Sequence, residues 1–213
     1  MQMPFSQSEF YDVFAAYNER LWPFAAGLWL VVLAATVVLV KRRRVGPSMN
    51  VVLFWLWAWA GIAYHAAFFT RINPAARGFA VLFVVQALLF LWVGVQRRRV
   101  AFGWERSPRH ALGLLLAGYA LAYPLLTLPG HPWPGVPSFG VPCPTTLFTA
   151  GVLLMAEPRV PRPLVVVPVA WCVVGGSAAL LFRVIPDLML FPAGVLLALW
   201  AFAPRTLSPS AET

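Results

Sequence analysis

Seven stretches of about twenty apolar residues constrain this chain more than any other feature of its sequence. A helix rises about 1.5 Å per residue and the hydrocarbon core of a bilayer is about 30 Å thick, so each stretch has the length that crosses a membrane. The composition agrees, because 61% of the 213 residues are hydrophobic and only 11% are charged. A soluble enzyme, a disordered chain, a disulfide scaffold and a coiled coil are thereby excluded. We predict an all-α, polytopic helical membrane protein with about seven transmembrane helices, at residues 21–40, 50–69, 78–96, 110–128, 139–156, 164–182 and 187–203.

The basic residues indicate an orientation. Seven spans place the two termini on opposite faces, and the short loops that are richer in Lys and Arg belong to the cytoplasmic face. With the N-terminus outside, twelve of the sixteen basic residues lie inside, at 41–44, 97–99, Arg106, Arg109, Arg159, Arg162 and Arg205. The outer face keeps Arg20, Arg71, Arg77 and Arg183. We therefore predict that the N-terminus is outside, the C-terminus is inside, and the net charge of +9 meets anionic lipid headgroups rather than nucleic acid.

The N-terminal segment contains no basic region and no small-residue cleavage site ahead of its apolar stretch, so we expect no removable signal peptide. After Ser8, apolar residues recur at helical spacing, at Phe10, Val13, Phe14 and Tyr17. This pattern predicts a short interfacial helix on the outer surface, after which Trp22 and Pro23 turn the chain into the membrane. The predicted division of the chain is an interfacial segment at 1–20, a transmembrane domain at 21–203 and a cytoplasmic tail at 204–213.

The interiors of the predicted spans hold no Asp, Glu, Lys or Arg. Intramembrane ionisable residues are typical of proton relays and ion pathways, so their absence argues against an ion-coupled pump. The only lysine, Lys41, lies in a basic loop, which excludes a retinal protein. Gln86 and Ser177 are expected to form interhelical hydrogen bonds, and the small residues at 175–179 to allow close helix packing. No internal repeat typical of transporters is found.

Three kinds of metal-ligating side chain gather on the predicted outer face. His65 lies near the end of the second span, His131 in the loop after the fourth, and Cys143 at the start of the fifth. Carboxylates at Glu9, Asp12, Glu19 and Asp187 share this face. Histidine, cysteine and carboxylate together can bind a metal, but their spacing matches no known ligand motif. The alternatives are a hydrogen-bonded interfacial His65, a solvated His131 and a Cys143 that packs as a small hydrophobe.

The segment from Pro124 to Pro144 contains seven prolines and cannot form a regular helix. Irregular backbone at membrane depth is tolerated only inside protein or beside a water-filled cavity. A helix restarts at Pro144 with the hydroxyl groups of Thr145, Thr146 and Thr149, and its N-terminus points toward the loop. The segment is either a lid that seals the bundle or part of a site for a small polar or anionic ligand. Asn73 and Pro74 are expected to form a turn beside it.

Several motifs resemble a known family. The segments YHxxFFxxINPAA, GHxWPxxPxFG, PCPTTxFTxG and GGSAA, with FYDVFAAYNERLWP near the N-terminus, are similar to the pattern of the bacterial domain of unknown function 6064. The resemblance covers nearly the whole chain and implies a multipass bacterial membrane protein, some of whose relatives carry permease-like names. It places His65, Asn73, His131, Cys143, Thr145 and Thr146 inside motif segments without implying a role for any of them.

These observations favour a small-molecule transporter or ligand-binding protein of the bacterial inner membrane, with its site on the periplasmic side under the loop at 124–144. It is expected to work as an oligomer, without catalytic residues or a cofactor. One alternative is a membrane metalloprotein or metal-dependent hydrolase that uses His65 and His131, and another is an accessory subunit of a membrane complex. The expected ligand-binding residues are His65, Asn73, His131, Cys143, Thr145, Thr146 and Thr149.

Overall fold

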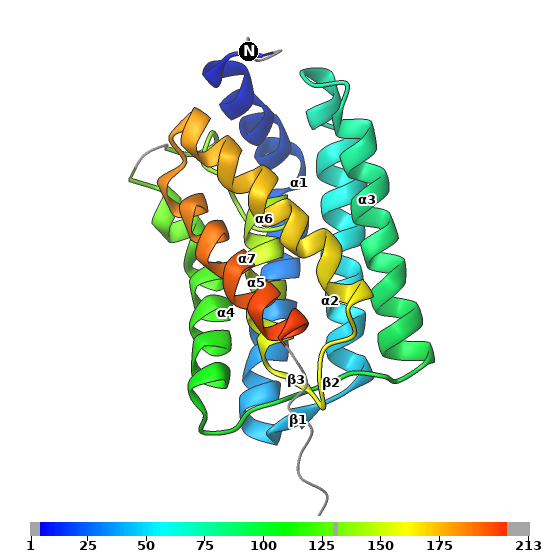
Figure 1. Cartoon of the computed structure of the whole chain (residues 1–213). Helices are drawn as coiled ribbons and strands as arrows, with labels where there is room; N and C mark the ends of the chain where they lie inside the picture. Colours follow the sequence, from blue (N-terminus) through cyan, green and yellow to red (C-terminus); the bar gives the residue numbers. More distant parts are fainter. Residues whose placement is uncertain (1–4, 130–131, 204–213) are drawn as a thin grey trace, which may run out of the picture.

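The computed structural model describes residues 5–129 and 132–203, which form a bundle of helices closed at one end by a small β-sheet (Figure 1). The α-helices are α1 (Gln7–Arg42), α2 (Pro47–Trp59), α3 (Ala76–Leu89), α4 (Pro108–Thr127), α5 (Pro142–Leu154), α6 (Pro163–Phe182) and α7 (Leu190–Phe202). Two π-helical segments, η1 (Ala60–Ala66) and η3 (Phe90–Gln96), continue α2 and α3. Two short 3-10 segments are η2 (Phe69–Arg71) and η4 (Ile185–Met189).

Six helical segments of the described chain are long and apolar enough to cross a membrane, which confirms the prediction of a polytopic helical protein. They are Gln7–Arg42, Pro47–Arg71, Ala76–Gln96, Pro108–Thr127, Pro163–Phe182 and Ile185–Phe202. The remaining helix, α5, differs from its predicted span at 139–156 because it has only 13 residues, about 20 Å of helix. It lies in the middle of the bundle, and every residue of it except Cys143 is buried (Figure 1).

The first helix is longer than the sequence suggested. A capping box formed by Ser6 and Glu9 begins α1, which then runs without a break through Pro23 to Arg42. The predicted helix start at Ser8 and the turn at Trp22 and Pro23 were therefore wrong, and the expected interfacial helix is the first part of α1. Packing accounts for the continuity, because the N-terminal turns bury Tyr11, Phe14 and Tyr17 in an aromatic cluster that offsets the hydrogen bond lost at proline.

A three-stranded antiparallel sheet, which was not predicted, joins three of the loops at the end of the bundle away from the N-terminus (Figure 1). Its strands, in spatial order, are β1 (Arg44–Val45), β2 (Ala101–Gly103) and β3 (Ala156–Glu157). The basic runs at 41–44 and 97–99 flank β1 and β2. The structure thus brings the two runs to the same end of the bundle. Which face of a membrane this end meets stays a prediction.

Side chains of neighbouring helices hold the proline-rich segment between α4 and α5. The Asn18 amide donates to the carbonyl oxygens of Pro134 and Val136, at 2.6 and 2.7 Å. The Tyr17 hydroxyl donates to Phe139 and the Thr127 hydroxyl to Pro137, at 3.3 and 3.0 Å. These side chains thereby supply hydrogen bonds to carbonyl groups of the irregular backbone, which would otherwise lack partners at membrane depth. The segment can consequently enter the bundle and begin α5 inside it.

Small residues set the closest helix contacts. A Cβ atom added at Gly151 of α5 would lie 2.5 Å from the carbonyl oxygen of Gly113 in α4. Gly176 of α6 packs against the ring of Phe191 in α7, which confirms the expected close packing near 175–179. Gln86 forms the expected interhelical hydrogen bond, to the Leu164 carbonyl oxygen. Ser177 does not, because its hydroxyl donates to Val173 in its own helix.

Candidate functional site

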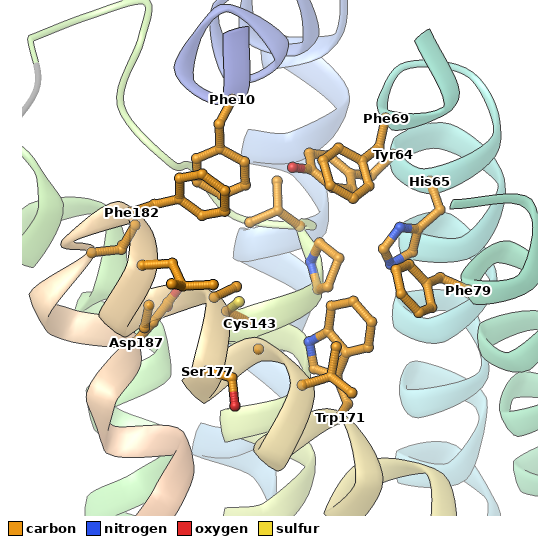
Figure 2. A pocket seen from close by; sticks show the side chains of 18 of the residues that line it. Phe10, Tyr64, His65, Phe69, Phe79, Cys143, Trp171, Ser177, Phe182 and Asp187 are labelled. Atoms are coloured by element: carbon orange, nitrogen blue, oxygen red, sulfur yellow. The ribbon is translucent and has the colours of Figure 1, made fainter. Parts of the chain in front are cut away.

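A cavity of about 390 Å³ lies at the end of the bundle away from the sheet (Figure 2). The first turns of α1, the segments η1 and η2, and helices α3 and α6 surround it, and the start of α5 reaches it from inside the bundle. Nine of its 23 lining residues are Phe, Tyr or Trp, at Phe5, Phe10, Phe14, Tyr64, Phe69, Phe79, Tyr123, Trp171 and Phe182. We call it the aromatic cavity. Its size and composition are those of a small-molecule site with few polar groups.

Ring contacts between distant segments build the wall of the aromatic cavity. Phe10 of α1 stacks on Phe182 at the end of α6, with ring centroids 4.5 Å apart. Phe14, one helical turn after Phe10, stacks on Tyr64 of η1 at 5.6 Å, and Tyr64 stacks on Phe69 at 5.8 Å. The i, i+4 spacing in α1 thus places two rings on the face that meets η1 and α6. These contacts explain why α1 extends beyond the length needed to cross a membrane.

The aromatic cavity opens along α6 on an apolar surface. Val173 and Leu181 line it, yet they are 58% and 60% exposed. Both belong to a helix that is long and apolar enough to cross a membrane. Exposed aliphatic side chains on such a helix suit contact with lipid rather than water. A molecule dissolved in the bilayer could reach the cavity through this opening.

Asp187 forms the polar part of the cavity wall (Figure 2). The sequence predicted it on the outer face beside the seventh span, but it is 5% exposed and belongs to the last membrane-length segment. Asp187 is the third residue of this segment, so the interior of the span still holds no ionisable residue, but the burial of Asp187 was not predicted. The Tyr123 hydroxyl donates to Asp187 Oδ1 at 2.5 Å, and Cys143 faces the same carboxyl group. No Lys or Arg side chain of the described chain contacts it.

His65 forms another corner of the cavity, from the π-helical segment η1. Its ring is fully buried among aromatic rings, with centroids 4.8 Å from Phe83 and 5.1 Å from Trp171. Neither ring nitrogen of His65 has a hydrogen-bond partner among the described residues. The alternative of a hydrogen-bonded interfacial His65 was therefore wrong. Because buried polar atoms without partners are costly, these groups are available to a ligand in the cavity.

The start of α5 differs from an anion-binding helix terminus. The helix begins at Pro142 rather than Pro144, so two of its first three residues are prolines without an N–H group. Among these three residues, only Cys143 retains a backbone N–H donor. The side chain of Cys143 contacts the carboxyl group of Asp187, which therefore lies close to the start of α5. A carboxylate at the positive end of a helix is favourable, whereas a second anion there would be repelled. The geometry does not favour the anionic ligand considered from the sequence.

The structure brings three of the predicted ligand-binding residues together, since His65, Asn73 and Cys143 all line the aromatic cavity. Asn73 also bonds the Ala75 backbone N–H in the expected turn. His131 lies outside the described residues.

The three threonines do not line the cavity, because they are fully buried farther along α5. Thr146 donates to the Pro142 carbonyl oxygen, and Thr149 donates to Thr145 and accepts from Trp57. Sequence reasoning missed Asp187, Tyr123 and Trp171. The one available signal was an acidic residue at the edge of an apolar span.

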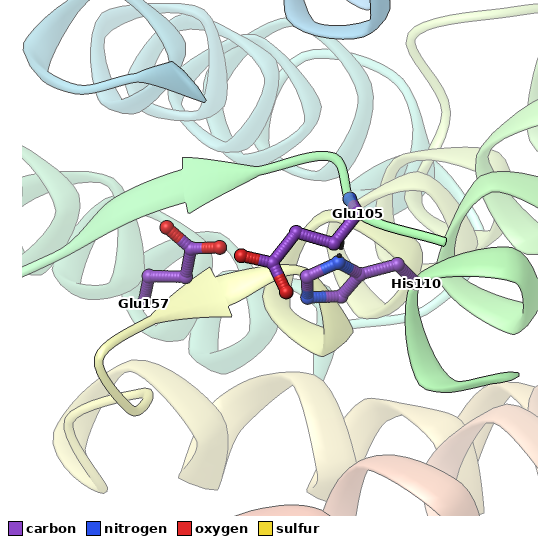
Figure 3. A group of neighbouring side chains, drawn as sticks. All are labelled: Glu105, His110 and Glu157. Atoms are coloured by element: carbon purple, nitrogen blue, oxygen red, sulfur yellow. Dashed lines mark hydrogen bonds between the residues drawn. The ribbon is translucent and has the colours of Figure 1, made fainter. Parts of the chain in front are cut away.

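A second group of polar side chains lies at the sheet end, where ligand atoms of Glu105, His110 and Glu157 come within 4.8 Å of one another (Figure 3). In the described chain, this is the one group of three His, Cys, Asp or Glu side chains close enough together to hold a metal ion. His65 is not part of such a group. The backbone N–H of Glu105 donates to His110 Nδ1 at 2.9 Å. A neutral ring then carries its proton on Nε2, which leaves no free lone pair for a metal. His110 is better explained as a hydrogen-bonded link between β2 and α4.

Comparisons with known proteins identify a family but no characterised relative. No match was found among curated proteins or among solved structures. The family of unknown function DUF6064 matches residues 7–213, which is nearly the entire chain. This chain belongs to the family of unknown function DUF6064.

Proposed function

We propose that this protein binds a small, largely apolar molecule in the aromatic cavity. The observation that carries the proposal is the cavity itself, with about 390 Å³ enclosed by aromatic side chains and an opening on apolar surface. The two buried ring nitrogens of His65, which have no partner among the described residues, add to the case. Such groups fix the orientation of a ligand in an otherwise apolar pocket.

We favour ligand binding over transport, although both were expected from the sequence. A transport path would have to continue from the aromatic cavity to the sheet end. The helix α5 stands in that direction, and the side chains of Leu147, Phe148 and Leu153 in it are fully buried. The described conformation is therefore a pocket closed at its inner end.

The proposal places the protein in the bacterial inner membrane, with the sheet end toward the cytoplasm. The six membrane-length helices support a multipass protein. The concentration of Lys and Arg in the loops near the sheet supports the orientation, because cytoplasmic loops carry such an excess. Anionic lipid headgroups would meet these side chains. The aromatic cavity would then open toward the outer leaflet.

Photolabelling tests the proposal directly. Purified protein in lipid nanodiscs is illuminated with increasing concentrations of the small apolar label 3-trifluoromethyl-3-phenyldiazirine, and the labelled residues are mapped by mass spectrometry. We expect labelling of Phe79 and Trp171, which line the cavity, to saturate. Labelling of lipid-facing residues such as Leu115 and Leu199, which are 69% and 65% exposed, should rise in proportion to the label.

A cavity-filling variant supplies the control. Ala178 is a half-buried residue of the cavity wall, and Ala178→Phe adds a ring to the space that the label would occupy. Val166→Phe enlarges an exposed side chain of the same helix outside the cavity. Saturable labelling should disappear in Ala178→Phe and persist in Val166→Phe. If labelling of Phe79 and Trp171 never saturates in the unmodified protein, the proposed function is wrong.

A further inference from the structure

We propose that the molecule bound in the aromatic cavity is a lipophilic amine whose cationic nitrogen binds the carboxyl group of Asp187. This inference rests on the proposed ligand-binding function and adds the chemical class of the ligand. It follows from the isolation of Asp187, from the donors around it and from the nature of the cavity wall.

Among the described residues, Asp187 is an acidic group without a basic partner. It is 5% exposed, and no Lys or Arg side chain of the described chain contacts it. Arg183, the basic residue nearest to it in sequence, is exposed at the end of α6. Acidic residues buried in membrane proteins are normally paired or functional, because an isolated charge is costly there. The missing counter-charge is what a cationic ligand would supply.

Hydrogen-bond donors, rather than cations, surround the carboxyl group of Asp187 in the described chain. The Tyr123 hydroxyl donates to Oδ1 at 2.5 Å, and the Cys143 thiol faces the carboxyl group. Cys143 is the second residue of α5, so the N-terminal turn of that helix also lies close to Asp187. Hydrogen-bond donors and a helix N-terminus stabilise negative charge without neutralising it. A cationic ligand would add the neutralising charge that these donors lack.

The rest of the wall suits a cation that carries an apolar body. Aromatic ring faces attract ammonium groups within about 6 Å, and desolvation strengthens the attraction. Phe10 and Phe182, whose ring centroids are 4.5 Å apart, line the same cavity as Asp187 (Figure 2). Tyr64, Phe69 and Trp171 continue the aromatic wall away from the carboxyl group. An amine with a hydrophobic group of a few carbons or one ring would place each of its parts against a matching surface.

Competition between matched head groups tests the charge of the ligand. The probes are 4-phenylbutylamine, 4-phenylbutanol and 5-phenylpentanoate, which share one phenylbutyl body and carry a positive, a neutral and a negative head group at pH 7. Each is titrated against saturable diazirine labelling of Phe79 and Trp171 in nanodiscs. We expect the amine to compete at concentrations at least ~10-fold lower than the alcohol, since cation–π attraction and ion pairing favour it. The carboxylate should compete least.

Charge-removing variants assign the effect to Asp187. Asp187→Asn should abolish the advantage of the amine over the alcohol, while the alcohol competes as before. Asp12→Asn, which removes an exposed carboxylate of α1 outside the cavity, should keep the advantage. The quantity compared is the ratio of the competing concentrations of the amine and the alcohol. Because the variants are measured in identical nanodiscs, this ratio is unaffected by differences in how the two probes partition into lipid.

The possible outcomes separate the two proposals. If labelling saturates but the three probes compete equally, or the carboxylate competes best, the amine assignment is wrong and the ligand-binding cavity stands. If labelling does not saturate, both proposals fail. Should Asp187→Asn fail to fold, the three-probe comparison on the unmodified protein still decides.

Discussion

The hydroxyl group of Tyr123, in α4, donates a hydrogen bond of 2.5 Å to the carboxyl group of Asp187, which follows it by 64 residues and lies in η4. Both side chains are buried and both line the aromatic cavity. The bond therefore joins the helix that precedes the proline-rich segment to the start of the last membrane-length segment. It also holds the one acidic group of the cavity wall in place.

Replacing Tyr123 by phenylalanine should lower the free energy of unfolding by about 1–3 kcal/mol, because a buried acceptor loses its partner. Reversible unfolding in mixed detergent micelles measures the change. Tyr119→Phe is the matched control, since the Tyr119 hydroxyl donates to the Pro186 carbonyl oxygen from a half-buried position in the same helix. An equal or larger loss in Tyr119→Phe would contradict the importance assigned to the Tyr123–Asp187 bond.

Gly151→Ala should be strongly destabilising, by about 3 kcal/mol or more, because the new methyl group would lie 2.5 Å from a carbonyl oxygen and 2.7 Å from the backbone nitrogen of Ala117. Neither atom can move without shifting α4. Gly118→Ala, on α4, is the control, since no atom lies within 4 Å of the added Cβ. Alanine is also the better helix former, so Gly118→Ala should be neutral or slightly stabilising. Thermal unfolding in detergent compares the two, and similar melting temperatures would refute the close α4–α5 crossing.

Asn18→Ala should loosen the proline-rich segment, because the carbonyl oxygens of Pro134 and Val136 lose a shared donor. We expect a loss of stability of about 2 kcal/mol or more. Limited proteolysis should cleave the chain between Pro129 and Phe139 faster in the variant. Thr70→Ala removes an exposed hydrogen bond to Ala66 and should leave this cleavage rate unchanged. Unchanged proteolysis in Asn18→Ala would show that the segment is held by other contacts.

Divalent zinc or manganese should not stabilise the protein through the group formed by Glu105, His110 and Glu157. The Nδ1 atom of His110 accepts the Glu105 N–H, so Nε2 keeps its proton and cannot coordinate a metal. His110→Ala should reduce stability by about 1–2 kcal/mol with or without added metal, since the backbone N–H loses its acceptor. Melting temperatures at several metal concentrations provide the measurement. A metal-dependent increase that His110→Ala abolishes would instead identify a metal site.

Reporter fusions test the orientation. Because β1 pairs with β2, fusions after Arg44 and Arg99 should report the same face of the membrane. The excess of basic residues predicts that this face is the cytoplasm, and that a reporter inserted between Pro132 and Ser138 lies in the periplasm. Alkaline phosphatase activity distinguishes the two compartments. The reverse pattern would place the opening of the aromatic cavity near the inner leaflet.

Local features of the sequence were sufficient for the helices that meet lipid. The predicted spans at 78–96, 110–128 and 164–182 agree with Ala76–Gln96, Pro108–Thr127 and Pro163–Phe182 to within two residues at each end. Length and hydropathy are enough to locate such segments, because a bilayer requires a sufficiently long apolar helix of each segment independently. The break at 132–141 was also predictable, since prolines remove the donors that a helix needs.

Burial inside the bundle depends on partners that are distant in sequence, which is why the candidate site was predicted only in part. His65, Asn73 and Cys143 were singled out because polar residues are rare in so apolar a chain. Asp187 was recognised as an acidic residue at the edge of a span, but its burial was not predicted, since a residue at such an edge can face either water or protein.

The sequence by itself determined that this chain is a helical membrane protein, where most of its long helices begin and end, and where its backbone becomes irregular. Each of these properties follows from a run of neighbouring residues and its length. Only the tertiary structure decided that α5 is enclosed by other helices, that three basic loops form a sheet, and that Asp187 lies in an aromatic cavity. A helix that is apolar on every side, like α5, carries no signal to distinguish lipid from protein as its surroundings. That distinction is made by contacts between distant segments, as between Tyr123 and Asp187.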